Sequence, residues 1–135
     1  MSIVKRNDNY TLEMVAGDDE YVRLNIRDEN DVIIQPGVGE GAVIGFKRIA
    51  SDTDFMVTQK TATMLIYDEV TQPYTIEFHF TSDETLDILG YDGKQRTRLS
   101  CVYDIEYQKT ILTEVTRTTL LGGTLKIKRS ISGAV

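Results

Sequence analysis

The alternation of apolar and polar positions predicts a chain built mostly of β-strands. The clearest run extends from Leu99 to Tyr107, where the odd positions are apolar or aromatic and the even positions are polar apart from Val102. Side chains along a strand point alternately to opposite faces, so this pattern indicates a strand with one buried face. Cys101 lies on the apolar face, and we therefore expect a buried, inert thiol.

Similar alternation predicts strands elsewhere in the chain. Residues 10–14 and 22–26 both alternate, and the Gly-Asp-Asp sequence at 17–19 favours a turn, so we expect a hairpin here. Residues 74–80 alternate without interruption and predict another strand. The remaining expected strands cover residues 43–49, 55–60, 62–67, 111–120 and 124–130, with Gly122 and Gly123 dividing the last two.

The periodicity changes after Phe80. Thr81 followed three residues later by Glu84 is a capping box, in which each side chain satisfies a backbone amide at the start of a helix. Leu86 and Leu89 are spaced for one face of a helix, and Gly90 follows where a helix would end. These features predict one short helix near residues 82–89.

About seven to nine short strands with frequent turn signals predict an all-β fold, an antiparallel β-sandwich or barrel. A chain of 135 residues is most simply one domain, so we expect a single domain over residues 1–135.

Charge and composition exclude several classes of partner. The net charge of −6 and pI near 4.7 are unfavourable for binding phosphate, so we expect no nucleic acid partner. No apolar run is long enough to span a bilayer, and we expect no membrane partner. Residues 1–10 are polar and charged, unlike a signal peptide, which predicts folding in the cytosol or export without a cleaved signal. The single cysteine excludes an internal disulfide.

Most groups that resemble reactive sites have a simpler explanation. His79 is the only histidine and lies on the polar face of its strand, so a surface position is expected. The acidic stretches 18–20 and 28–31 contain turn-forming residues and lack a calcium-loop spacing. The glycines in 37–41 are not followed by the Lys and Ser or Thr of a nucleotide-binding loop. We therefore predict no cofactor and no metal.

Asp104 and Glu106 share one face of the predicted strand, at a spacing of roughly 6 to 7 Å by strand rise. Two carboxylates at such a distance serve in glycosidases. Ion pairing with Arg or Lys on neighbouring strands is the simpler explanation. We therefore predict that the chain is not an enzyme and name no catalytic residue.

Exposed tyrosines and strand cations are the candidate interface residues. Tyrosine in loops can anchor a protein interface or stack on a sugar. Cations on edge strands either block unwanted sheet pairing or form a docking surface. The predicted interface residues are Tyr91, Tyr67, Arg96, Arg98, Lys126 and Lys128.

The order of these elements resembles the N-terminal domain of baseplate upper proteins from tailed phages and prophages of Gram-positive bacteria. Residues 10–18 are similar to the opening strand and Gly-Asp turn of that family, and 22–28 to its second strand. Residues 80–86 resemble its strand and Thr-capped helical turn. Residues 103–107 and 122–127 resemble its Tyr-Asp strand and terminal hairpin.

The resemblance implies an immunoglobulin-like β-sandwich that helps to build a virion tail or baseplate. It implies contacts with other baseplate proteins, possible homo-oligomers in the tail, and synthesis in the cytoplasm of a host bacterium. In that family a longer C-terminal part carries receptor-binding proteins, and no catalytic residues are carried over. The alternative hypothesis is a carbohydrate- or ligand-binding β-sandwich that uses loops at one end, with Tyr67, Tyr74 or Tyr91 in the site.

Overall fold

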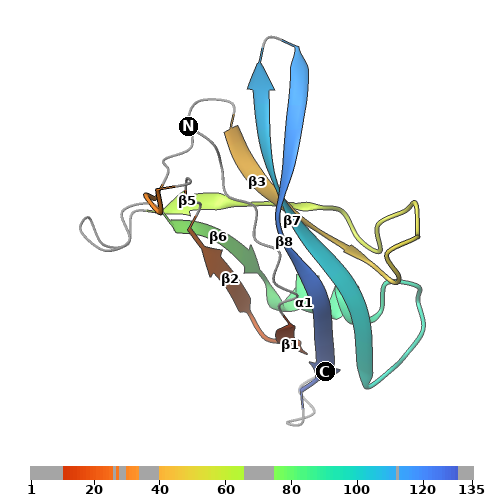
Figure 1. The fold of residues 1–135 in the computed structure, drawn as a ribbon. Helices are drawn as coiled ribbons and strands as arrows, with labels where there is room; N and C mark the ends of the chain where they lie inside the picture. The colour runs from red at the N-terminus through yellow and green to blue at the C-terminus, as the bar shows by residue number, and fades with distance from the viewer. Residues whose placement is uncertain are drawn as a thin grey trace.

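The computed structural model describes residues 11–25, 27, 30–33, 40–65, 75–111 and 113–130. This part of the chain is mostly β-strand with one short helix, as the alternation predicts (Figure 1). The elements are β1 (Leu12–Ala16), β2 (Glu20–Leu24), β3 (Glu40–Lys47), β4 (Lys60–Thr61), β5 (Thr63–Leu65), β6 (Thr75–Phe80), α1 (Ser82–Leu89), β7 (Arg98–Ile111) and β8 (Glu114–Arg129). They form a five-stranded sheet in the order β1-β8-β7-β3-β4 and a three-stranded sheet in the order β2-β6-β5.

The hairpin of β7 and β8 dominates the larger sheet. The two strands have 14 and 16 residues, and the tip of the hairpin projects beyond β3 (Figure 1). The register shifts after Ile105, which pairs with Leu121, because Glu106 pairs with Thr119 and leaves Leu120 as an extra residue. Such a β-bulge bends a strand and increases its twist.

The expected break at Gly122 and Gly123 is wrong. Both glycines lie inside β8, paired with Asp104 and Tyr103 of β7. Glycine weakens a strand locally, but the pairing that continues on both sides keeps this segment extended.

The predicted N-terminal hairpin is also wrong. β1 pairs in parallel with β8, whereas β2 pairs antiparallel with β6 in the other sheet. The turn does form, with Gly17 at a φ of 97°, but it carries the chain from one sheet to the other. We expected every strand pair to be antiparallel, and the parallel pairing of β1 with β8 shows that this expectation is wrong.

The segment between β3 and β6 differs in part from the prediction. Residues 55–59 belong to no strand, so only Lys60 of the expected strand 55–60 lies in a strand, at the start of β4. In the expected strand 62–67, Thr63–Leu65 form β5, and residues 66 and 67 lie outside the described residues. The predicted strand 43–49 is shifted, because β3 begins at Glu40 and ends at Lys47. Tyr67, Tyr74, the acidic pair 28–29 and most of the glycine loop 37–41 lie outside the described residues.

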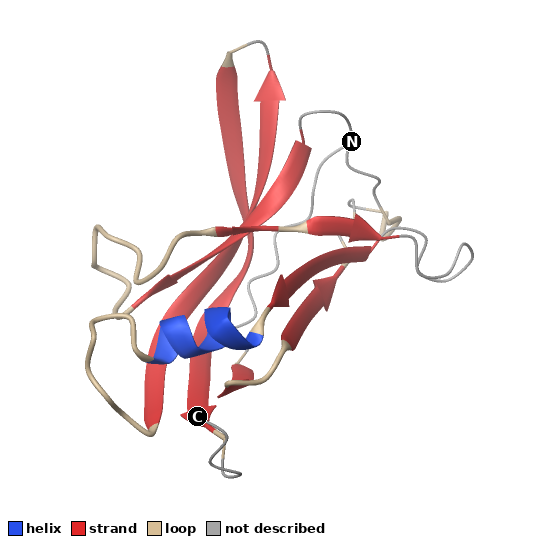
Figure 2. Cartoon of the chain, turned by 180° about the vertical axis from the view of Figure 1, so that it is seen from behind, coloured by secondary structure: helices blue, strands red, loops and turns tan. Residues whose placement is uncertain are grey.

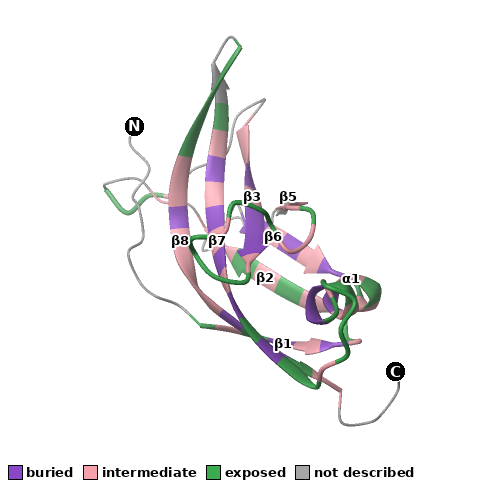
Figure 3. Ribbon diagram, turned by 90° about the vertical axis from the view of Figure 1, so that its right-hand side faces the viewer, coloured by how far each residue is buried: buried purple, intermediate pink, exposed green. Residues whose placement is uncertain are grey.

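The core is formed by the apolar faces of the strands together with α1, and Figure 3 shows these buried segments in purple. The odd positions of β7 from Leu99 to Tyr107 are all buried, as predicted. Phe46 of β3 packs edge-to-face against Phe80 of β6, with ring centroids 5.7 Å apart, and so joins the two sheets.

The helix α1 has the predicted bounds and the predicted cap. The Thr81 hydroxyl accepts from the Glu84 amide, and the Glu84 carboxylate accepts from the Thr81 amide. The fully buried Thr85 hydroxyl accepts from the Gly17 amide and donates to the Asp18 carbonyl oxygen, both at 3.0 Å. These bonds fix α1 beside β1, where Figure 2 shows it in blue.

Candidate functional site

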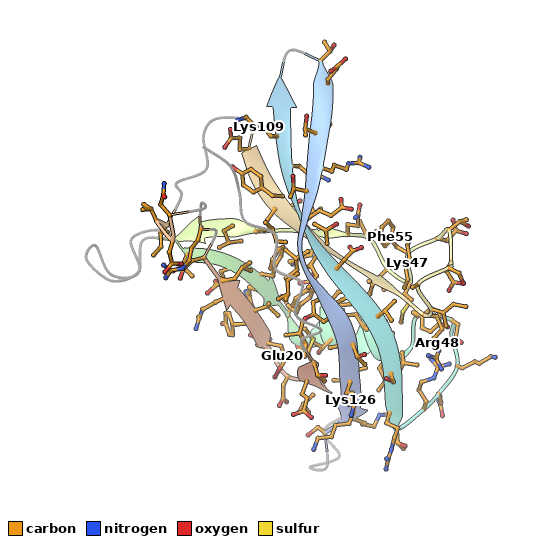
Figure 4. The ribbon with its side chains drawn as sticks, in the orientation of Figure 1. Glu20, Lys47, Arg48, Phe55, Lys109 and Lys126 are labelled. Atoms are coloured by element: carbon orange, nitrogen blue, oxygen red, sulfur yellow. The ribbon has the colours of Figure 1, made fainter. Side chains whose placement is uncertain are left out.

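Three of the predicted interface residues come together on the outer face of the larger sheet. Arg98 of β7 lies directly opposite Lys128 of β8, and Lys126 lies two residues further along the same face. All three are exposed, whereas the neighbouring Leu125 and Ile127 point into the core. We call Arg98, Lys126 and Lys128 the basic patch; Lys126 is labelled in Figure 4.

The basic patch is not neutralised within the part of the chain that is described. None of its three side chains forms an ion pair there. Glu13 of β1 is the one acidic residue in register, opposite Lys126, while Val15 stands opposite Lys128. Like charges directly opposite each other weaken a strand pair. Arg98 and Lys128 form such a like-charged pair on the surface of a chain that is acidic overall. The basic patch is therefore complementary in charge to an acidic partner.

Arg96 belongs to a different, internally satisfied network. Its guanidinium donates to both carboxylate oxygens of Asp92, at 2.9 and 2.8 Å, and to the Leu89 carbonyl oxygen at 2.8 Å. The hydrogen bonds from Arg96 lower the pKa of Asp92 to about 2. The guanidinium also lies 5.4 Å from the ring centroid of Tyr91. Arg96 therefore holds the loop after α1.

Tyr91 is half-buried and lines two hollows at the surface. One, of about 420 Å³, is also lined by Phe80, Glu84 and Asp87. The other, of about 270 Å³, contains Arg48, Asp52 and Asp54. The predicted partner Tyr67 lies outside the described residues, so the structure places only Tyr91 at these hollows.

A third hollow, of about 390 Å³, lies on the outer face of the larger sheet. Its floor contains Asp104, which stands in register between Gly45 of β3 and Gly122 of β8. Phe55 covers Gly45, and the Lys47 ammonium lies 4.9 Å from the centroid of the Phe55 ring (Figure 4). The sequence carried no signal for this arrangement, because Phe55 reaches Gly45 from a loop.

The expected pairing of Asp104 and Glu106 with basic residues opposite them is wrong. Glycines flank Asp104, and Val43 and Thr119 stand opposite Glu106. Burial raises the pKa of Asp104, and the charge of Lys47 opposes this rise. A regular register sets which residues face one another, and alternation within one strand does not reveal it.

The histidine and the cysteine are both held in structural contacts. His79 stacks on Tyr21, with ring centroids 4.5 Å apart, and its Nε2 lies 3.5 Å from an Asp19 carboxylate oxygen. Cys101 is buried, as predicted, and burial raises its pKa to about 11. Among the described residues, no three His, Cys, Asp or Glu side chains gather as metal ligands.

The outer edge of β8 is a second exposed feature. β1 pairs only with residues 125–129 of β8, so residues 114–124 have no strand partner on that side among the described elements. Residues 114–117 are exposed, including Val115, whose exposure is 51%. An unpaired strand edge presents backbone donors and acceptors to another chain.

No family model and no curated protein matches the chain. Within the described residues, no helix is long and apolar enough to cross a membrane.

Proposed function

We propose that this chain is a non-enzymatic assembly module of a phage or prophage tail baseplate, acting through protein–protein contacts. Its place is the virion tail, among other baseplate proteins or copies of itself. Two independent considerations support this proposal: the resemblance to the N-terminal domain of baseplate upper proteins, and the surface of the hairpin formed by β7 and β8.

The observation that carries the proposal is the edge of β8 at residues 114–124, which has no strand partner on the side away from β7 among the described elements. Soluble proteins usually shorten, cover or charge such edges, because an exposed edge recruits other strands. Adding a strand from a partner to an open edge is a common mode of protein recognition, in which backbone hydrogen bonds provide affinity. An edge of this length on a projecting hairpin suits assembly.

The immunoglobulin-like sandwich is part of the same proposal. A five-stranded and a three-stranded sheet that share an apolar core support it. The parallel pairing of β1 with β8 is a departure from the antiparallel version that we expected.

The genes that flank the coding sequence provide the first test. We expect tail-tape-measure, tail-fibre or lysis genes, whereas sugar-utilisation or metabolic genes would argue against a virion protein. The products of the flanking tail genes are then co-expressed with the tagged chain, and at least one should co-purify with it.

The role of the edge is tested with the double variant Val115→Lys and Thr119→Lys. Lysines on an edge strand oppose strand addition, so we expect this variant to lose the co-purified partner. The matched control places the same charges at the exposed loop positions Ser51 and Thr58 and should keep the partner. If the edge variant still binds the partner, the edge of β8 is not the binding surface.

A ligand-binding module is the second candidate, favoured by the two hollows that share Tyr91. A tyrosine ring beside carboxylates, here Asp87, Asp52 and Asp54, provides the stacking surface and the acceptors that sugars use. A glycan array distinguishes the candidates: binding that is lost in Tyr91→Ala would favour this one.

A further inference from the structure

We infer that the basic patch binds the acidic surface around α1 of a second copy of this chain. The inference deepens the proposed assembly function and rests on it, because it names one partner. It uses a surface that is separate from the open edge of β8.

The first step is the unbalanced charge of the basic patch. Arg98 and Lys128 face each other across two strands, and Lys126 adds a third cation on the same face. Holding these charges together costs stability in the isolated molecule. A partner that brings carboxylates to this face removes the repulsion.

The second step is that this chain carries a complementary surface. The acidic cap consists of four exposed carboxylates at the turn between β1 and β2 and along α1: Asp18, Asp19, Asp83 and Asp87. Hydrogen bonds join the two segments, because Asp19 accepts from the Ser82 amide and Thr85 donates to the Asp18 carbonyl oxygen.

The acidic cap is also poorly compensated. Asp83 and Asp87 are four residues apart on one helix, a spacing at which like charges repel. Asp18, Asp83 and Asp87 form no ion pair with another described residue. The cation on the neighbouring strand β4, Lys60, forms its ion pair with Glu84. Burial raises the pKa of the nearby Glu20, and the charge of Asp18 adds to this rise.

The charges also determine the kind of contact. In a two-fold dimer built on the basic patch, the patch of one copy would meet the patch of the other, and cations would face cations. Patch against cap joins surfaces of opposite charge, either twice in a reciprocal two-fold dimer or once per neighbour in a heterologous ring or open array. The net charge of −6 means that any second copy is on average acidic.

The test uses charge reversal on each side of the contact. The patch variant is Lys126→Glu with Lys128→Glu, and the cap variant is Asp18→Lys with Asp87→Lys. Self-association of the wild type is measured by analytical ultracentrifugation over a range of protein concentrations. We expect each variant to weaken self-association about tenfold or more. An equimolar mixture of the two should associate again, because each surface of one variant meets a surface of opposite charge in the other.

Controls separate a specific contact from general repulsion. Lys94→Glu with Ser51→Glu and Thr58→Glu changes the net charge by the same amount as the patch variant, at exposed positions outside the basic patch and outside the edge of β8, and should associate as the wild type does. At an ionic strength of about 1 M the Debye length is about 3 Å, so the wild type should dissociate. Circular dichroism confirms that every variant is folded.

Several results would overturn the inference. One is a wild type that stays monomeric at all concentrations, another is equal weakening by the control, and a third is a mixture that forms no complex. Association that resists salt and charge reversal but is lost with Val115→Lys and Thr119→Lys would assign self-assembly to the edge of β8. That outcome would leave the proposed function intact and remove this contact from it.

Discussion

At the scale of single residues, Gly45 shows how one missing side chain shapes the outer face. A Cβ atom at this position would lie 2.5 Å from Cε1 and 2.9 Å from Cδ1 of Phe55. The ring must therefore shift before any larger residue fits. The loop that carries Phe55 is held on the sheet by this contact and by Lys47.

We predict that Gly45→Ala destabilises the fold by about 1 to 2 kcal/mol in urea unfolding, because the new methyl group displaces Phe55. In a Phe55→Ala background the same substitution should be neutral or stabilising, because alanine restricts the unfolded chain more than glycine does. If Gly45→Ala lowered the free energy of unfolding equally in the wild type and in the Phe55→Ala background, the clash with the Phe55 ring would not be the cause.

Asp92 gives a prediction about pH. Hydrogen bonds from Arg96 lower its pKa from 3.8 to about 2, so the ionised carboxylate is favoured in the folded state. The resulting stabilisation is complete above pH 4 and disappears as the pH falls through about 2. We expect Asp92→Asn to lower the melting temperature at pH 7 and to have little effect near pH 2. The control Gln95→Ala, at an exposed position of the same loop without a titrating group, should show no such dependence.

At the scale of elements, one buried hydroxyl joins α1 to the turn between β1 and β2. Replacing Thr85 by Val keeps the shape of the side chain but leaves the Gly17 amide and the Asp18 carbonyl without this partner. Unsatisfied buried groups cost about 1 to 3 kcal/mol, so we predict a loss of that size in urea unfolding.

Hydrogen exchange locates the effect of Thr85→Val. Exchange at the Gly17 amide should increase in the variant, while the amides of the hairpin formed by β7 and β8 stay protected. Thr85→Ser keeps the hydroxyl and is the matched control, although it also removes a buried methyl group. An unchanged Gly17 amide would contradict this account.

The elements that sequence reasoning predicted are those with local signals. Alternation identified β7, and the capping box at Thr81 and Glu84 identified α1 to the residue. Gly122 and Gly123 led to a wrong prediction of a strand break. Both glycines pair with residues of β7, and this pairing keeps β8 continuous. The pairing of β1 depends on a strand far away in the sequence, which periodicity does not reveal.

The same distinction applies to the candidate site. Sequence reasoning placed Lys126 and Lys128 together on the last strand and Arg98 elsewhere, and the register of β7 against β8 makes all three neighbours. It also named Arg96, but Arg96 is held by Asp92 and Leu89. The hollow over Gly45 was not foreseen, because it depends on where a loop returns to the sheet.

At the scale of the whole molecule, the chain has two surfaces suited to different contacts. The open edge of β8 offers backbone hydrogen bonds, which depend little on salt. The basic patch and the acidic cap offer charge, whose effect is strongly screened. We expect an assembly built from both to loosen in salt without separating completely, which light scattering over a salt series would detect.

The parallel pairing of β1 with β8 bears on how the protein is made. β1 is the first strand of the described chain and β8 is the last, so β1 has no sheet partner until the ribosome has released β8. Contacts between segments so distant in sequence are slow to form. Until β8 has been made, Met14 and Ala16 lack the strand that pairs with β1 in the folded protein, and the growing chain has an apolar strand that a chaperone can hold.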